Sequence, residues 1–332
     1  MTNQNHILHI QYPVGQGGLH LGIIGDVAYI YDCGGYGKNV DWSNFFDEIC
    51  NQIKSHNAQE IHVFISHWHH DHCNHLEELY DYLKKHGFKD SAPQDTQNKL
   101  TPFEQISYLC EFNSTPEEYK EYYNIITGEK LTQHAVFTNT NIKTNTIDIN
   151  IEKYGLYQFQ HHVSQKRSDK MSSSLIDKCK ELCNFSIKVL INKMQSYQFR
   201  NIVKQYYKIV KHENRYTNHN QMLCLYCDGK NDSNENWLHT GDAPMASVRY
   251  RKDMQKHYQS KGISLKYANI IQIPHHASRY NHNSNFFDIF DKTNIRKLYY
   301  TIGDGNVKPK IGDLGKMPIK AVSEVSTTKI TM

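Results

Sequence analysis

A short segment of the chain is rich in side chains that bind metal ions. The segment HWHHDHCNH, residues 67–75, contains five histidines and one aspartate. His67 and His69 stand two residues apart, so their imidazoles can chelate one ion, and the adjacent pair of Asp71 and His72 can chelate another. Imidazole and carboxylate together suit Zn²⁺, Mn²⁺ or Fe better than Ca²⁺ or Mg²⁺. The spacing therefore predicts a site for a metal of the first kind.

The other members of this segment have simpler interpretations. We expect His70 and His75 to face solvent or to cap the helix that follows, and Cys73 to be a packing residue. His239, within the later run WLHTGD, alternates with the core face of its strand and is expected to be structural.

The metal-binding segment lies between a strand and a helix. The run EIHVFIS, residues 60–66, is typical of a buried strand. Leu76, Leu79 and Leu83 recur at helical spacing, up to a predicted stop at Gly87. Loops at strand ends present functional groups, so this position favours a fixed role over a random histidine-rich tract.

Further strands are predicted on both sides of this segment. A helix is expected to begin at Asp41 or Ser43, and a turn at residues 32–35 is expected to end the strand before it. The remaining strands are expected at residues 6–12, 19–24, 27–31, 222–227, 237–240, 268–273 and 297–302. Two of the late strands end at Asp242 and at the pair His275-His276.

These motifs carry a resemblance to a known family. HWHHDH matches the H-x-H-x-D-H signature of the metallo-β-lactamase fold superfamily. That superfamily also expects a turn after an early strand, which residues 32–34 fit, and a late aspartate within T-G-D, which residues 240–242 fit. A final histidine after another strand is matched by His275-His276. The resemblance implies an α/β fold, an αββα sandwich in which two β-sheets pack face to face with helices outside.

A subgroup of the superfamily is also indicated. VGQGG at 14–18, WLHTGD at 237–242 and PHHAS at 274–278 look like the V-G-Q-G-D, L-L-T-G-D and P-H-H-G-S runs of the hydrolase domain in bacterial DNA-uptake competence proteins. The resemblance covers about residues 6–86 and 218–306. Gly18 replaces the usual Asp and Ala277 the usual Gly, and NVKP at 306–309 stands where relatives often carry His-Pro. These departures leave the substrate of this branch open.

The resemblance implies two divalent metal ions, with Zn²⁺ expected and Mn²⁺ as the alternative. Asp242 would bridge the two ions. The other implied ligands are divided between them, with His67 and His69 on the first ion and Asp71, His72 and His276 (or His275) on the second. Asp32 would hold a ligand imidazole in its correct tautomer.

The first ion usually takes a third histidine from the middle of the chain. The leading candidates are His161 and His162, and His134 and His219 are weaker ones. Relatives of the competence type often lack this ligand, so its absence would not exclude the family.

The implied chemistry is hydrolysis. A hydroxide activated by two metals about 3.5–4 Å apart would attack phosphorus or a carbonyl carbon, and Asp71 would orient or deprotonate the water. We expect a phosphodiesterase or nuclease acting on nucleic acid or a related phosphodiester. The alternatives are a small-molecule ester or lactone hydrolase, an effector module of a larger assembly such as a defence system, and a degenerate fold that only binds a partner.

The whole chain is expected to form one domain over residues 1–332, with an insertion at about 90–217. The insertion reads as two polar strands or a hairpin at 138–159, followed by a basic, largely helical segment at 168–212. Lys166, Arg167 and Ser278 are candidate substrate-binding residues. The net charge of +4 is mild, and we see no signal peptide and no apolar run of the roughly 20 residues that span a membrane. A cytoplasmic protein without a membrane partner is therefore expected.

The eight cysteines show no disulfide-like rhythm, so free thiols are expected. Cys224 and Cys227 lie three residues apart in an apolar run that reads as a strand. Residues at this spacing point to opposite faces of a strand, so the two thiols are expected to pack rather than share a metal ion.

Overall fold

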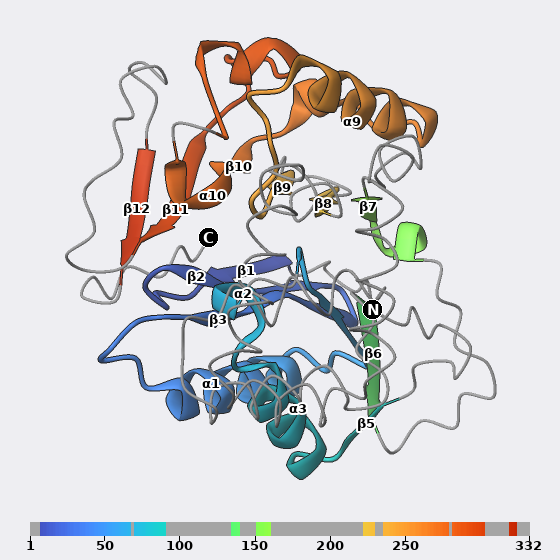
Figure 1. The fold of residues 1–332 in the computed structure, drawn as a ribbon. Coiled ribbons are helices and arrows are strands. Elements are labelled where there is room, and N and C mark those ends of the chain that lie inside the picture. The colour runs from blue at the N-terminus through green and yellow to red at the C-terminus, as the bar shows by residue number, and fades with distance from the viewer. Residues whose placement is uncertain are drawn as a thin grey trace, which may run out of the picture. The chain divides into compact units, whose positions relative to one another are not determined.

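The structure is a computed structural model, which describes residues 7–67, 70–90, 134–139, 151–160, 222–229, 235–278, 281–302 and 319–323. The chain divides into two compact units, one made of residues 1–92, 133–161 and 222–332 and the other of residues 93–132 and 162–221. All of the described residues belong to the first unit, and its elements are drawn in Figure 1.

The first sheet has six strands in the order β1-β2-β3-β4-β6-β5. Its strands are β1 (Ile7–Gln11), β2 (Gly17–Ile24), β3 (Val27–Gly35), β4 (Glu60–Phe64), β5 (Phe88–Asp90) and β6 (His134–Asn139). Only β3 and β4 pair in parallel, with Val27 opposite Glu60, and the other neighbours are antiparallel. The end of β4 therefore lies beside the end of β3.

The second sheet also has six strands, in the order β12-β11-β10-β9-β8-β7. Its strands are β7 (Leu156–Gln160), β8 (Leu223–Cys227), β9 (Trp237–His239), β10 (Ile270–Gln272), β11 (Lys297–Ile302) and β12 (Ile319–Ser323). The strands from β9 to β12 are parallel. Because parallel strands end at the same edge of a sheet, the segments that follow β9, β10 and β11 meet there.

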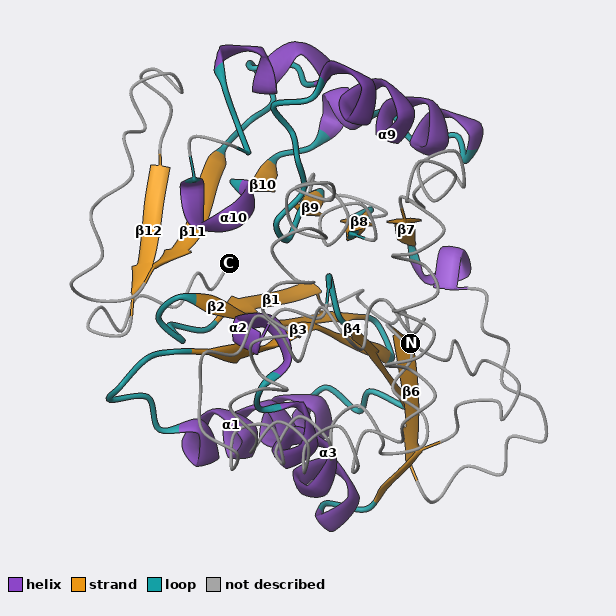
Figure 2. Ribbon diagram, in the orientation of Figure 1, coloured by secondary structure: helices purple, strands orange, loops and turns teal. Residues whose placement is uncertain are grey.

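The two sheets pack against each other through an aromatic core. Tyr29, Tyr31 and Phe64 of the first sheet share one buried cluster with Trp237 and Tyr299 of the second. The Tyr31 hydroxyl donates a hydrogen bond to the Leu223 carbonyl at 2.6 Å, which ties β3 to β8. Figure 2 shows the two sheets as layers with helices on their outer sides.

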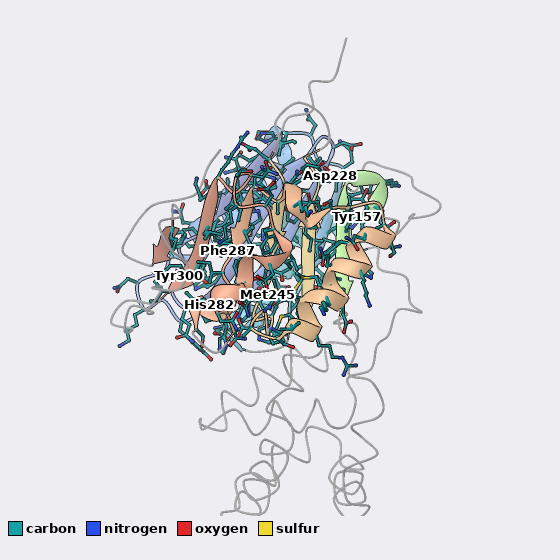
Figure 3. All side chains as sticks on the ribbon, turned by 90° about the horizontal axis from the view of Figure 1, so that it is seen from above. Tyr157, Asp228, Met245, His282, Phe287 and Tyr300 are labelled. Carbon is teal, nitrogen blue, oxygen red and sulfur yellow. The ribbon has the colours of Figure 1, made fainter. Side chains whose placement is uncertain are left out.

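Helices cover the outer face of each sheet. The helices α1 (Trp42–Ser55) and α3 (Leu76–Lys85) lie beside the first sheet, and α9 (Val248–Ser260) lies on the second. Tyr250 and Met254 of α9 join a buried cluster that includes Met245, Phe287 and Tyr300, which are labelled in Figure 3. The short helices are α2 (His70–Cys73), α10 (Pro274–Ala277), η1 (Ile151–Tyr154), η4 (Leu265–Tyr267) and η5 (Ser284–Ile289).

Most of the expected elements are present. The mixed α/β class and the two sheets are confirmed. Asp41 is the N-cap of α1, since its carboxylate accepts a hydrogen bond from the Asn44 amide at 3.1 Å. Cys224 and Cys227 are buried in two different core clusters, so they lie on opposite faces of β8 as predicted. No helix among the described residues is long and apolar enough to cross a membrane.

The structure differs from the expected elements at three points. The strand β3 does not end at Tyr31 but continues to Gly35, because Asp32, with φ of 60°, is an extra residue in a β-bulge opposite Leu19 and His20. Within 138–159, the described strands do not form a hairpin, because β6 pairs with β4 and β5 while β7 pairs with β8. The helix α9 was not expected, because its buried residues stand in a run with many charges.

Candidate metal centre

The residues predicted to bind metal meet where several strands end. His67 follows β4, Asp242 follows β9, and His276 follows β10. Asp71 and His72 lie in α2, which packs against β2 and β3. Chain segments from both sheets thus contribute to one cluster.

One group of ligand atoms is formed by His67, His72 and Asp242, which lie within 4.8 Å of one another. The Asp242 carboxylate stands between the two imidazoles. Its Oδ2 is 3.6 Å from His67 Nε2, and its Oδ1 is 3.2 Å from His72 Nε2. All three side chains are at most 3% exposed, so they could hold an ion out of contact with bulk water.

A second group is formed by Asp71, His72 and His276, also within 4.8 Å. His276 Nε2 lies 3.1 Å from Asp71 Oδ2, which also accepts a hydrogen bond from Gln16 Nε2 at 3.4 Å. Of the histidine pair at 275–276, it is His276 that joins Asp71 and His72. His275 contacts the other carboxylate, with its Nε2 3.5 Å from Asp242 Oδ2.

Asp32 fixes the tautomer of His72. Its Oδ2 lies 2.7 Å from His72 Nδ1, and a carboxylate can only accept, so Nδ1 carries the proton. The Ser66 amide donates to Asp32 Oδ1 at 2.6 Å and the Ser66 hydroxyl donates to Oδ2 at 3.0 Å. His72 Nε2 is therefore left to face the two candidate groups. This is the arrangement expected behind a metal-binding imidazole.

Ser66 fixes the tautomer of His67 in turn. The only proton of the Ser66 hydroxyl goes to Asp32, so the oxygen must accept from His67 Nδ1, which lies 3.0 Å away. His276 is oriented in the same way, because its Nδ1 lies 3.1 Å from the Thr301 carbonyl. In all three histidines Nδ1 donates to the protein and Nε2 points toward a carboxylate.

Charge compensation dominates the electrostatics of the cluster. Burial alone would lower the pKa of His72, but the carboxylates of Asp32, Asp242 and Asp71 outweigh burial and hold that pKa well above its ordinary value. Burial would raise the pKa of Asp71, yet His72 and His276 outweigh it and hold that pKa below its ordinary value. The cluster therefore attracts positive charge, which either protons or metal ions can supply.

The residues present fit a divalent metal ion. His72 Nε2 is buried and faces Asp242 Oδ1 at 3.2 Å, in a contact that does not meet the geometry of a regular hydrogen bond. A buried polar atom of this kind needs a partner, and a metal ion would be one. Imidazole nitrogens and carboxylate oxygens are also the ligand set of Zn²⁺ and Mn²⁺ sites.

Tight backbone contacts hold the ligands in place. Gln272 Oε1 accepts from the amides of Thr240 and Gly241 at 2.9 and 3.0 Å, which fixes the turn before Asp242. A Cβ at Gly18 would approach Asp32 Cβ to 2.8 Å, so the glycine makes room for Asp32. A Cβ at Gly34 would approach the Cys73 amide to 2.5 Å, so α2 sits directly on β3.

Several residues that shape the cluster were missed in the sequence. Thr301 acts through its backbone carbonyl, which no residue type reveals. Ser66 and Gln272 read as ordinary strand residues, and only their contacts across the fold show their role. The signal that could have found them is position, since each stands at the C-terminal end of a predicted strand.

Other predicted residues can be placed individually. His239 is fully buried between the sheets, and Cys73 is 1% exposed, so both are structural as expected. His75 occupies the N-cap position of α3, although its side chain makes no capping hydrogen bond, and it stacks on Trp42 at 3.8 Å. Ser278 is half-buried, and its amide donates to the His275 carbonyl.

Some predicted residues lie outside the described residues. They are His69, His161, His162, Lys166, Arg167, His219 and the runs 168–212 and 306–309. Of His134 only the backbone is described, where it begins β6 opposite Phe64. The assignment of a third histidine to the first ion therefore stays a prediction.

No protein-family model matches this chain, and no curated protein matches it. The resemblance to the metallo-β-lactamase superfamily therefore rests on the sequence motifs alone.

Proposed function

We propose that this chain is a metal-dependent hydrolase of the metallo-β-lactamase fold, which uses two divalent metal ions, Zn²⁺ or Mn²⁺, to cleave phosphodiesters. One observation carries the proposal. Three histidines, His67 and His72 of the segment 67–75 and His276 after β10, each donate Nδ1 to the protein and turn Nε2 toward Asp242 or Asp71.

The described protein groups beside the cluster are poorly suited to attack a substrate themselves. Burial raises the pKa of both Cys33 and Cys73, so their thiols stay protonated and unreactive. The Ser66 hydroxyl is fully buried and donates its proton to Asp32. A water molecule is therefore the expected nucleophile.

Bound metal ions would supply a water of lowered pKa and positive charge for the developing substrate oxygens. The chain's own residues orient this chemistry. Asp71 would orient the water or take its proton, the two roles that a carboxylate at this position allows. Gln16 holds the Asp71 carboxylate from the VGQGG run.

The choice of phosphodiester substrates rests on the sequence. The VGQGG, WLHTGD and PHHAS runs resemble those of DNA-uptake competence hydrolases, and the segment at 168–212 is basic. A basic, aromatic segment suits a phosphate backbone. An ester or lactone substrate would use the same metal site, so an assay has to separate the two classes.

The test is a hydrolysis assay in metal-controlled buffer with Zn²⁺ or Mn²⁺. The substrates are single-stranded DNA, RNA, a generic phosphodiester, a simple aryl ester and a lactone. We expect cleavage of the phosphodiesters, and loss of activity in His69→Ala and Asp242→Ala with the fold retained by circular dichroism.

His56→Ala serves as the control, because His56 caps the C-terminal end of α1 and contacts the Gln52 carbonyl. Full activity in either site variant would refute the site assignment. Hydrolysis of the ester or lactone alone would replace the phosphodiesterase proposal with the small-molecule one.

A further inference from the structure

The histidine pair at 275–276 has an unusual backbone. His275, His276 and Ala277 all have positive φ, at 53°, 51° and 61°. Residues with a side chain rarely adopt this left-handed conformation, and three in a row persist only where the surroundings impose them. Here the His275 amide donates to the Gly241 carbonyl at 3.0 Å and the Ser278 amide to the His275 carbonyl at 2.7 Å. The turn is thus built against the segment that carries Asp242.

The imidazole of His275 is oriented as firmly as those of the other site histidines. Asn281 Nδ2 donates to the Asp242 carbonyl at 2.7 Å, so Asn281 Oδ1 is turned toward His275. His275 Nδ1 lies 2.6 Å from this oxygen and must donate to it. Asn281 is buried, and its own carbonyl accepts from the Ala246 amide. The proton of His275 is therefore on Nδ1, and Nε2 carries the lone pair.

The Nε2 atoms of the pair diverge toward different carboxylates. His276 Nε2 lies 3.1 Å from Asp71 Oδ2, whereas His275 Nε2 lies 3.5 Å from Asp242 Oδ2. The same Asp242 oxygen lies 3.6 Å from His67 Nε2. Asp242 Oδ2 is thus flanked by two imidazoles that both present a lone pair. The left-handed turn allows adjacent residues to reach both sides of the cluster.

We propose that His275 is a ligand of the first metal ion, together with His67 and Asp242. The two histidines of the pair then serve different ions, and His275 takes the place of the third histidine that the sequence analysis sought in the middle of the chain. This inference rests on the proposed function, because it presumes a two-metal site.

The test measures metal content and affinity rather than activity. Purified protein is loaded with Zn²⁺, passed through a desalting column and analysed for zinc per chain, and affinities are measured by titration against a chromophoric chelator. We expect two ions in the wild type and in His56→Ala, and one ion in His275→Ala. His276→Ala should also retain one ion.

A second variant covers the case in which His275→Ala does not fold. Asn281→Leu keeps the His275 side chain but removes the acceptor for Nδ1, together with the donor to the Asp242 carbonyl. We expect the affinity for one of the two ions to fall about 10- to 100-fold, as for other groups that orient a metal-binding histidine, with the other affinity unchanged.

The results separate this inference from the proposed function. Two ions with unchanged affinities in both His275→Ala and Asn281→Leu would overturn the inference and leave the hydrolase proposal standing. The same holds if His134→Ala, His161→Ala or His162→Ala loses one ion while His275→Ala loses none. A wild-type chain that binds one ion would contradict the inference. A wild-type chain that binds no ion would contradict the proposed function itself.

Discussion

Each imidazole that we propose as a metal ligand depends on a second residue that sets its tautomer. His72 donates to Asp32, His67 to Ser66, and His276 to the Thr301 carbonyl. Proper spacing of the residue types is not enough to form the site. An imidazole that carries its proton on Nε2 could not bind a metal ion through that nitrogen. The partners at Nδ1 are therefore as much a part of the site as the ligands.

Asp32 offers a direct test at the residue scale. Asp32→Asn removes the charge that favours the Nδ1-protonated His72, and it replaces one of the two accepting oxygens by an NH2 group that cannot accept from Ser66 or His72. We expect zinc affinity to fall about 10- to 100-fold, with hydrolysis falling in parallel. Competition titration with a chelator measures the affinity.

The matched control is Asp41→Asn, which changes a carboxylate that accepts one backbone amide at the start of α1. Its zinc affinity should equal that of the wild type. Equal affinities in Asp32→Asn and the wild type would show that Asp32 does not orient a ligand.

The elements place the ligands through close backbone packing. The helix α2 carries Asp71 and His72, and β3 supports it where Gly34 approaches the Cys73 amide. The bulge in β3 turns Asp32 toward the same helix. Gly34 is thus required by contact distances and not by flexibility alone.

Gly34→Ala tests this packing at the element scale. The new Cβ would lie 2.5 Å from the Cys73 amide and 2.7 Å from Asn74 Oδ1, so α2 must move away from β3. We expect a loss of stability of about 1–3 kcal/mol and weaker zinc binding, measured by urea unfolding and by chelator competition.

Gly262→Ala is the control, because a Cβ there meets nothing within 4 Å, although its φ of 76° is also unfavourable for alanine. It should lose some stability but keep its zinc affinity. If Gly34→Ala kept the wild-type affinity, the position of α2 would not depend on this contact.

At the scale of the whole molecule, three buried histidines lie between the two sheets. His9, His20 and His239 surround the Tyr29 hydroxyl, which lies 3.1, 3.4 and 3.1 Å from their ring nitrogens. Each is at most 1% exposed. Burial lowers the pKa of His9 to about 3 and lowers the pKa values of His20 and His239 well below their ordinary range. All three are therefore neutral in the folded protein at neutral pH.

Because the pKa values of these histidines are lowered in the folded protein, we expect the free energy of unfolding of the metal-free protein to fall in acid. Their pKa values are near 6.5 in the unfolded chain and lower in the folded one, so stability is full above 6.5 and falls as the pH drops below it. Each contributes about 1.4 kcal/mol per pH unit, up to about 4 kcal/mol for the three. Between pH 6 and 5 His72 adds no slope, because its raised folded pKa leaves it protonated in both states.

The measurement is urea unfolding at pH 6.0, 5.5 and 5.0 in the presence of a chelator. His20→Phe should reduce the slope of the unfolding free energy against pH by about a third, since one of three titrating groups is removed. His56→Ala should keep the wild-type slope. Identical slopes in His20→Phe and the wild type would mean that this cluster does not titrate on unfolding.

The sequence by itself was informative where function depends on local spacing. The strand at 60–66, the ligand segment that follows it and the aspartate of T-G-D could all be predicted, because hydrophobic period and residue type are local properties. The helix α9 and the strand β12 were not predicted, since their buried residues become recognisable only against the sheet that covers them.

Only the tertiary structure showed how the candidate imidazoles are oriented. Sequence alone could not distinguish His275 from His276, because the difference lies in Asn281 and Thr301, which approach from other segments of the fold. The role of Asp32 likewise needed the bulge that turns it toward His72. Residue types and spacing determined which atoms can bind a metal ion. Folding determined which nitrogen of each imidazole faces the site, because the hydrogen-bond partner of the other nitrogen comes from elsewhere in the chain.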